Sequence, residues 1–326
     1  MFDFLFDLVS RLQSVKAEKN LLVFGHTNID HIFSVQFLPE KNQTTEVFEH
    51  KVLFGGTGAN LALQAASLGL KVYLSSYVGG DFPEKFRNKL KKAGVQLDYF
   101  FVRKEAITPT CWIYNDRKQN QMIFIEQGAM KEMENYPLPE IHLNNFDFVH
   151  VGTGRPIYYL RLFESWKREW NKSEEKPVLA FDPGQEMHYV YTKERFSAMM
   201  KYVDIFFGNR EEWKISLDYL GFSEASYINK ISSLAIRTLG KEGAEIFWEG
   251  KRLFIPSVKV FKKRDTTGAG DAFRAGFYAA LLRGASVEEA GWFASLTASF
   301  FLWKKNGEEH LPTFERLRRF LEMAKD

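Results

Sequence analysis

Cysteine is almost absent from this chain. The single Cys111 excludes an internal disulfide and a metal site built from several cysteines. A chain without disulfides is typical of a reducing compartment, so we expect a cytoplasmic protein. Long apolar runs are missing as well. No 18 apolar residues follow one another without interruption, which argues against a transmembrane helix.

An excess of charge of one sign is also lacking. The 44 Lys and Arg residues face 41 Asp and Glu residues, which leaves a net charge of +3 without a long block of either sign. We therefore expect neither nucleic acid nor a membrane as a partner. Apolar residues are abundant: 45% of the 326 residues are hydrophobic and 16% are aromatic. This predicts about two domains, or one large α/β domain with an appendage.

Two common nucleotide-binding motifs are missing. The sequence has no Gly-x-x-x-x-Gly-Lys-Ser/Thr element, which argues against a Walker-type phosphate loop. The segment 55–60, Gly-Gly-Thr-Gly-Ala-Asn, is a glycine-rich entry to a helix. However, Leu61 stands where a dinucleotide fingerprint needs its last glycine, which weakens a Rossmann interpretation.

Residues 1–20 are predicted to form an amphipathic extension. Apolar residues recur there at helical spacing, namely Phe2, Leu5, Phe6, Val9 and Leu12. Asp3 and Asp7 stand where a signal peptide would carry positive charge. We expect a helix that packs on its own domain or on a partner subunit, and a helix on a membrane surface is the alternative.

Residues 21–326 alternate between short apolar runs and helical segments. The runs expected to be strands are 21–24, 72–78, 147–151, 178–181, 205–207 and 234–238. Their pattern predicts a doubly wound, mostly parallel α/β sheet flanked by helices. The stretches 31–54 and 107–127 carry consecutive strands without a helix, and we expect them to form a small β-sheet lid over the site.

The segment 265–273, Asp-Thr-Thr-Gly-Ala-Gly-Asp-Ala-Phe, carries the strongest chemical signal. A Gly-Ala-Gly turn that leads into a helix exposes backbone N–H groups at the positive end of the helix dipole, which predicts an anion site. Asp271 lies in the first turn, where a carboxylate can take a proton from an attacking hydroxyl. The alternative is structural, with Asp271 as a helix cap and the glycines as a tight turn.

These motifs resemble those of the ribokinase-like (PfkB-type) carbohydrate kinases. Gly55-Gly56-x-x-x-Asn60 and Asp265-x-Thr267-Gly268-Ala269-Gly270-Asp271 occur in the family's order, and the resemblance covers nearly the whole chain after residue 20. It implies a ribokinase-like kinase domain over 21–326 with ATP and Mg²⁺ as cofactors. Asp271 is similar to the catalytic base, and the Gly268, Ala269 and Gly270 amides to the hole for the transferred phosphoryl group.

The resemblance also implies binding roles for other residues. The acceptor hydroxyls would be held by Asp30, Gly55, Gly56 and Asn60. The nucleotide would be bound by Asn209, Thr238, Gly240, Gly243 and Ala298. Asn209 and Glu212 match an element that influences Mg²⁺ indirectly, and a capping pair is the structural alternative. Asp265 and Thr267 match the start of a monovalent-cation loop, and the need for K⁺ stays open.

The acceptor is indicated by a departure from the family pattern. Phe181-Asp182-Pro183-Gly184-Gln185 lacks the Asp-x-Asn-x-Arg form of many sugar kinases and is similar to the archaeal-type nucleoside kinase branch. So is the segment from Asn120 to Gly128, which includes Gln127. Phe33, Trp112 and Phe124 in the lid strands are candidates for stacking on a nucleobase, and packing in the lid core or a dimer is the alternative.

We therefore expect an ATP-dependent kinase that transfers the γ-phosphoryl group to the 5′-hydroxyl of a nucleoside. A kinase of a free sugar, polyol or sugar phosphate is the alternative within the same family. A catalytically silent nucleotide-binding regulator is the alternative outside the enzymes. By the same resemblance, a homodimer through the lid is expected.

Overall fold

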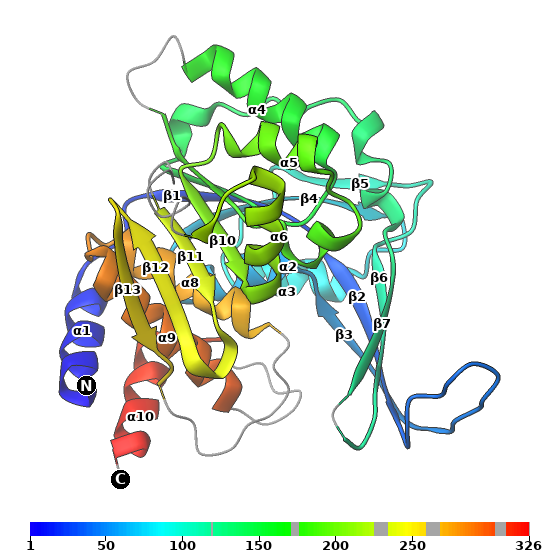
Figure 1. The fold of residues 1–326 in the computed structure, drawn as a ribbon, viewed down its shortest axis with the longest axis horizontal. Helices are drawn as coiled ribbons and strands as arrows, with labels where there is room; N and C mark the ends of the chain where they lie inside the picture. Colours follow the sequence, from blue (N-terminus) through cyan, green and yellow to red (C-terminus); the bar gives the residue numbers. More distant parts are fainter. Residues whose placement is uncertain (119, 171–175, 225–233, 259–267, 304–310, 326) are drawn as a thin grey trace.

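A nine-stranded sheet forms the centre of the molecule (Figure 1). The computed structural model describes residues 1–118, 120–170, 176–224, 234–258, 268–303 and 311–325. The strands in sheet order are β13 (Lys251–Pro256), β12 (Gly243–Trp248), β11 (Leu234–Thr238), β10 (Ile205–Asn209), β9 (Val178–Phe181), β8 (Phe148–Val151), β1 (Asn20–Phe24), β4 (Lys71–Gly79) and β5 (Phe100–Arg103).

The strands β5, β4, β1, β8, β9, β10 and β11 run parallel to one another in this sheet. Strands β12 and β13 add an antiparallel hairpin at one edge. This confirms the predicted doubly wound α/β class. The central parallel strands β1, β8 and β10 are almost wholly buried, which explains why they form short continuous apolar runs in the sequence. The sequence interpretation had not identified the hairpin, whose turn residues Glu249 and Gly250 both have positive φ.

Helices cover both faces of the sheet, and each layer has its own buried cluster. One layer contains α1 (Phe2–Ser14), α2 (Thr57–Ser67), α3 (Glu84–Lys92), α8 (Ala269–Leu281), α9 (Val287–Trp303) and α10 (Phe314–Lys325). The other contains α4 (Pro156–Trp170), α5 (Lys193–Met200) and α6 (Arg210–Leu220). Short 3₁₀ helices connect them: η1 (Gly128–Met130), η2 (Met133–Asn135), η3 (Leu143–Asn145), η4 (Gly184–His188) and η5 (Gly240–Glu242). No helix among the described ranges has the length and apolarity that crossing a bilayer requires.

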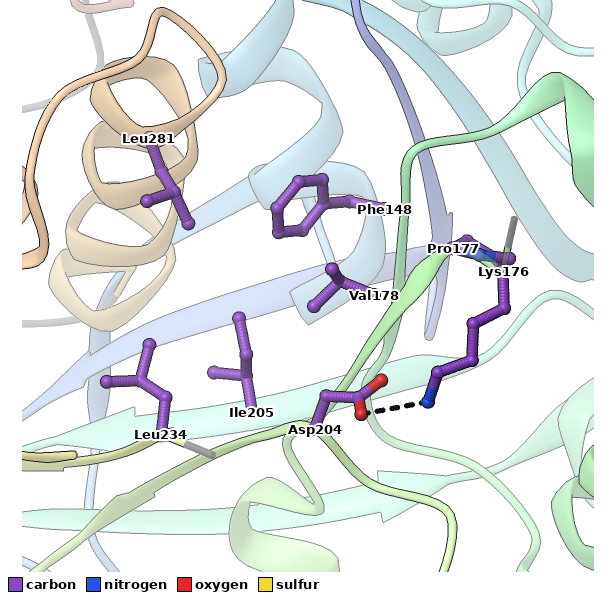
Figure 2. Close-up of a pocket in the computed structure, with 8 residues that line it drawn as sticks. All are labelled: Phe148, Lys176, Pro177, Val178, Asp204, Ile205, Leu234 and Leu281. Atoms are coloured by element: carbon purple, nitrogen blue, oxygen red, sulfur yellow. Dashed lines mark hydrogen bonds and ion pairs between the residues drawn. The ribbon is translucent and has the colours of Figure 1, made fainter. Parts of the chain in front are cut away.

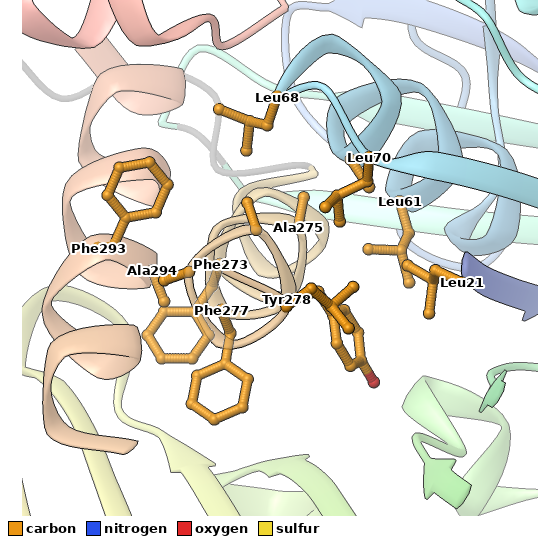
Figure 3. Close-up of a cluster of buried hydrophobic side chains, with 14 of the residues drawn as sticks. Leu21, Leu61, Leu68, Leu70, Phe273, Ala275, Phe277, Tyr278, Phe293 and Ala294 are labelled. Carbon is orange, nitrogen blue, oxygen red and sulfur yellow. The ribbon is translucent and has the colours of Figure 1, made fainter. Parts of the chain in front are cut away.

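Helix α8 lies in the middle of the first layer, between α2 and α9 (Figure 3). Phe273, Phe277 and Tyr278 point from it into the surrounding cluster. A glycine is needed at position 276, because a Cβ there would lie only 2.5 Å from Thr297 Oγ1 of α9. This close contact sets the short distance between α8 and α9.

A second sheet forms the lid. Its order is β3 (Val47–Gly55), β2 (Asn28–Val35), β6 (Thr110–Asn115) and β7 (Gln121–Glu126). In Figure 1 these four strands extend together away from the main sheet, toward the lower right. Each of the two stretches that lack helices forms an antiparallel pair, and their first strands, β2 and β6, lie side by side and run parallel. The structure therefore confirms the predicted lid sheet.

Helix α1 packs on α9 and α10, at the outer side of the first helical layer. Leu5, Leu8, Val9 and Leu12 are buried in this contact, whereas Phe2 and Phe6 are only partly buried. At the edge of this contact, Arg11 forms an ion pair with Glu289, and Lys325 forms one with Asp3. The apolar stripe of the first 20 residues thus meets protein.

We predict that Leu5→Ala lowers the free energy of unfolding by about 2–5 kcal/mol, because the fully buried side chain leaves a cavity. Chemical denaturation followed by circular dichroism measures this change. Ser10→Ala on the exposed face of the same helix should change it by less than about 0.5 kcal/mol. Equal effects of the two variants would show that α1 is not packed as described.

Candidate active site

The N-terminus of α8 presents Asp271 at the carboxyl edge of the parallel strands. Gly268 precedes the helix with φ +82°, a conformation that favours glycine. The N–H groups of the first turn have no acceptor within the helix and point toward a potential anion. Asp271 is itself buried, and Asn60 Nδ2 donates a hydrogen bond of 3.1 Å to its Oδ2.

Burial raises the pKa of Asp271 to about 7, because the carboxylate loses its hydration. Arg274 and the hydrogen bond from Asn60 act in the opposite direction and lower this pKa. Asp271 can therefore exchange a proton near neutral pH. A carboxyl group of this kind is suited to general base catalysis.

Asp30 forms the other side of the site. It lies on β2, and a Cβ on Gly55 would lie 2.3 Å from its Oδ2, so a side chain at position 55 would displace the Asp30 carboxyl group. Burial raises the pKa of Asp30 to about 6, and the charge of Asp30 adds to the raised pKa of Asp271. The structure thus brings the two carboxyl groups together. Gly56 is the N-cap of α2, whose first turn contains Asn60.

The predicted nucleotide-binding residues lie along the same strand edge. Asn209 ends β10 and pairs in register with Thr238, the last residue of β11. Gly240 and Gly243 flank the η5 turn that follows β11. Ala298 is half-buried in α9. The α9 helix joins this edge through Ser295, whose hydroxyl accepts a hydrogen bond from the Val258 N–H.

Asn209 and Glu212 form a helix-capping pair. The Asn209 side chain accepts the Glu211 and Glu212 N–H groups, and Glu212 Oε2 accepts the Asn209 N–H at 2.7 Å. This is the structural alternative considered for the two residues. Burial and the charge of Asp182 nevertheless raise the pKa of Glu212 to about 7.

Comparisons with known proteins agree with this geometry. A model of the pfkB family carbohydrate kinases matches residues 18–313. The chain belongs to this family. It is 32% identical to a nucleoside kinase of Methanocaldococcus jannaschii, over 94% of this chain and 98% of the relative. It is 33% identical to a nucleoside kinase of Methanothermobacter thermautotrophicus, over 94% and 97%.

A solved structure shows the same fold. The crystal structure of the M. jannaschii nucleoside kinase, an archaeal member of the ribokinase family, superposes with a TM-score of 0.83 at 30% identity. The match covers 94% of this chain and 99% of that one. The predicted family is thereby confirmed, and the protein is an ATP-dependent phosphotransferase.

Arg274 is a site residue of this kinase that sequence reasoning missed. It lies one turn after Asp271, is buried, and forms an ion pair with Asp182 at the end of β9. A Cβ on Gly270 would lie 2.6 Å from Arg274 Nη1, so the guanidinium lies against the turn that opens α8. The available signal was a guanidinium within an otherwise apolar helix, since a buried arginine needs a partner.

The lid of the kinase does not turn Trp112 and Phe124 toward Asp30. Asp30 pairs in register with Cys111, which pairs with Ile125, so these three side chains share one face. The next residues along each strand, Trp112 and Phe124 among them, point to the opposite face. The prediction that they stack on an acceptor bound at Asp30 is therefore wrong for this lid position.

Phe33 shares the face of Trp112 and Phe124. Its ring stacks on His50 at 4.3 Å and on Tyr114 at 4.8 Å, with the aromatic groups forming a layer on one side of the lid. Phe124 is 54% exposed there. Gln127, in contrast, follows β7 and contacts residues beside the strand edge that carries the site, namely His26, Glu186 and Tyr189.

The described residues contain no group of three or more His, Cys, Asp or Glu side chains placed to hold a metal ion. Asp265 and Thr267, the candidates for a cation loop, lie outside the described residues. Their role stays a prediction.

A separate apolar hollow of about 300 Å³ lies at the other end of the sheet (Figure 2). Four of the residues that line it are the first residues of their strands, namely Phe148, Val178, Ile205 and Leu234. Ligands of open α/β sheets bind beyond the carboxyl ends of the strands. The hollow is therefore distinct from the site around Asp271.

We predict that Arg274→Met shifts the acid limb of the turnover–pH profile upward by about 1 unit or more, because a nearby positive charge favours the carboxylate of Asp271. Turnover measured between pH 5.5 and 9 tests this. Arg274→Lys keeps the charge and should leave the limb near its wild-type position. An unshifted limb in the methionine variant would contradict the electrostatic link to Asp271.

Proposed function

We propose that this protein is a nucleoside kinase that transfers the γ-phosphoryl group of ATP to the 5′-hydroxyl of a nucleoside. The observation that carries the proposal is the convergence of Asp30, Asn60 and Asp271 at the buried N-terminus of α8. The nucleoside kinases among its relatives, which match along almost the whole chain, support the same acceptor class.

Each residue has a distinct task in this proposal. Asp30 and Asn60 hold acceptor hydroxyls, and the Gly55–Gly56 backbone allows the acceptor to come close. Asp271 takes the proton of the 5′-hydroxyl as its oxygen bonds to the γ-phosphorus, and the bond from that phosphorus to ADP breaks. The Gly268–Gly270 amides stabilise the charge on the phosphoryl oxygens, as an anion site at a helix N-terminus can.

Arg274 adds a fixed positive charge beside this turn. Its guanidinium neutralises part of the negative charge of Asp182 and Asp271, which share the same buried region. Phosphoryl transfer needs little covalent chemistry from the protein. Its main requirements are that the protein aligns the reacting groups, neutralises their charge and keeps water away. The lid would exclude water when it covers the acceptor.

ATP is proposed to lie along Asn209, Thr238, Gly240, Gly243 and Ala298, at the strand edge next to α8. Magnesium would come with the nucleotide, since Mg²⁺ keeps several waters and binds mainly to phosphates with few carboxylates. Glu212 would act on it through water, because one oxygen of Glu212 is occupied by the helix cap. K⁺ at Asp265 and Thr267 stays a proposal from resemblance.

We propose a homodimer through the aromatic face of the lid. On this face, opposite Asp30, Phe124 is exposed and His31, Phe33 and Trp112 are partly buried. A large exposed apolar patch on a soluble protein is typical of an interaction site. This use also explains why these rings are not directed toward the acceptor.

The acceptor class is tested by a coupled assay of ADP release. We expect the highest kcat/KM for a nucleoside among purine and pyrimidine nucleosides, free sugars, polyols and sugar phosphates. Asp30 and Asn60 add no positive charge for a phosphorylated acceptor, and the nucleoside kinases among the relatives favour a nucleoside over a free sugar. A sugar or sugar phosphate with a kcat/KM above every nucleoside would replace the proposed function by the sugar-kinase alternative.

We predict that Asp271→Asn lowers turnover by at least about 10²-fold, because the amide cannot accept a proton. Its KM for ATP should stay near the wild-type value. The free energy of unfolding of this variant at pH 8 should not fall below that of the wild type. Burial destabilises the charged Asp271 carboxylate, and the asparagine that replaces it is neutral. Turnover within a few-fold of wild type would leave Asp271 with a capping role only.

For the wild-type enzyme, turnover should rise with pH through about 7, the pKa of Asp271. The sign follows from the role of the carboxylate, which accepts a proton only after losing its own. A pH profile of kcat at saturating substrates measures the limb. A profile that is flat between pH 5.5 and 8 would contradict the assignment.

A further inference from the structure

Tyr189 is a half-exposed aromatic residue at the carboxyl edge of the sheet. It directly follows η4, the short helix after β9, and 59% of the residue is exposed. Its hydroxyl group nevertheless has a fixed partner, because Gln127 Nε2 lies 3.2 Å away. The ring therefore faces solvent while its far end is anchored in the protein.

The anchor belongs to a buried polar network. Gln127 Nε2 also donates to Glu186 Oε1 at 2.9 Å, and the other oxygen of Glu186 accepts the Gly154 N–H. Because the carboxylate only accepts hydrogen bonds, the orientation of the Gln127 amide is fixed. Its oxygen then lies 2.6 Å from His26 Nε2, which donates to it.

The network continues beneath the site. In the neutral imidazole with its proton on Nε2, Nδ1 of His26 accepts a hydrogen bond of 2.7 Å from the Thr153 hydroxyl. The Thr153 oxygen in turn accepts from the Thr57 hydroxyl at 2.6 Å. Thr57 is the first residue of α2, the helix that carries Asn60. One chain of hydrogen bonds thus runs from Tyr189 to Thr57, at the start of the helix that carries Asn60.

Gln127, which holds the Tyr189 hydroxyl, directly follows β7, two residues after Ile125 on the Asp30 face of the lid. Cys111 shares the Asp30 face and hydrogen-bonds with Asp30, and Asn28 Nδ2 donates to its sulfur at 3.3 Å. Burial of the hydroxyl and the charge of Glu186 raise the pKa of Tyr189 to about 12, and Cys111 is near enough to add to this shift. The aromatic layer of Phe33, Trp112 and Phe124 lies across the lid sheet.

We propose that the ring of Tyr189 is the wall against which the base of the acceptor lies, with Gln127 and Glu186 as positioning residues. This inference rests on the proposed nucleoside kinase function. A ring held in place before binding loses little conformational freedom when a ligand stacks on it. Stacking on an aromatic side chain tolerates different bases, since every base has a π face. The site would therefore accept both purine and pyrimidine nucleosides.

The test compares Tyr189→Ala with Phe254→Ala in the full-length enzyme. Phe254 is a matched control, because it is an aromatic residue of similar exposure, 51%, on the edge strand β13 of the main sheet. For Tyr189→Ala we expect KM for inosine and for cytidine to rise about tenfold or more, the range of losing one base-stacking contact. KM for ATP should stay within about twofold, and Phe254→Ala should change neither the nucleoside KM nor the ATP KM by more than about twofold.

Tyr189→Phe separates the ring from its anchor. It keeps the stacking surface and loses one hydrogen bond, so KM for both nucleosides should rise by less than about fivefold. A larger rise than in Tyr189→Ala would contradict the stacking role. So would an equal rise in KM for ATP, which indicates a general structural effect.

The outcomes for the two proposals are separable. Wild-type enzyme that acts on nucleosides, together with an unchanged nucleoside KM in Tyr189→Ala, overturns only the role of Tyr189. Wild-type enzyme that phosphorylates sugars and no nucleoside overturns the proposed function and this inference with it. A selective rise in nucleoside KM in Tyr189→Ala supports both.

Discussion

Ten consecutive residues of helix α8, Asp271–Ala280, are buried, because the helix lies between α2 and α9 in the first helical layer. Small residues are needed where its neighbours come closest, and Gly276 against Thr297 is the tightest example. The position of α8 in turn places its N-terminus at the carboxyl edge of the strands. The same packing that stabilises the fold therefore keeps the first turn, with Asp271, away from water.

Removal of water from this turn has an electrostatic consequence. Asp182, Glu212, Asp271 and Arg274 are all buried in one region, and burial is the largest cause of the raised pKa of each of the three carboxyl groups. A buried charge is costly unless it is paired, and the ion pair of Arg274 with Asp182 supplies one such pairing. Asp271 has the weaker partner Asn60 and so remains free to exchange its proton near pH 7.

The two faces of the lid have different environments. Asp30 and Cys111 face the site, whereas His31, Phe33, Trp112 and Phe124 form the other face. One sheet can therefore serve a bound acceptor and a second surface at once. Next to the ends of the lid strands, the network of His26, Gln127 and Glu186 fixes Tyr189 without using any residue of the aromatic layer.

Local sequence patterns were enough for most elements and for the family. Short apolar runs gave the strands β1, β8, β9 and β11 nearly residue for residue, since buried parallel strands have few other patterns. The Gly55–Asn60 and Gly268–Asp271 motifs gave the two loops, because a glycine-rich turn before a helix has a local physical reason. The β12–β13 hairpin was missed, although its Glu249-Gly250 turn is a local signal.

Only the tertiary structure decided which side chains meet. The alternation along β6 shows that Trp112 and Cys111 point to opposite faces, but the face that meets Asp30 depends on the register between β2 and β6. That register, the contact of Asn60 with Asp271 and the pairing of Arg274 with Asp182 join segments far apart in the chain. Such contacts depend on the free energy of packing the whole domain, which no local pattern of residues contains.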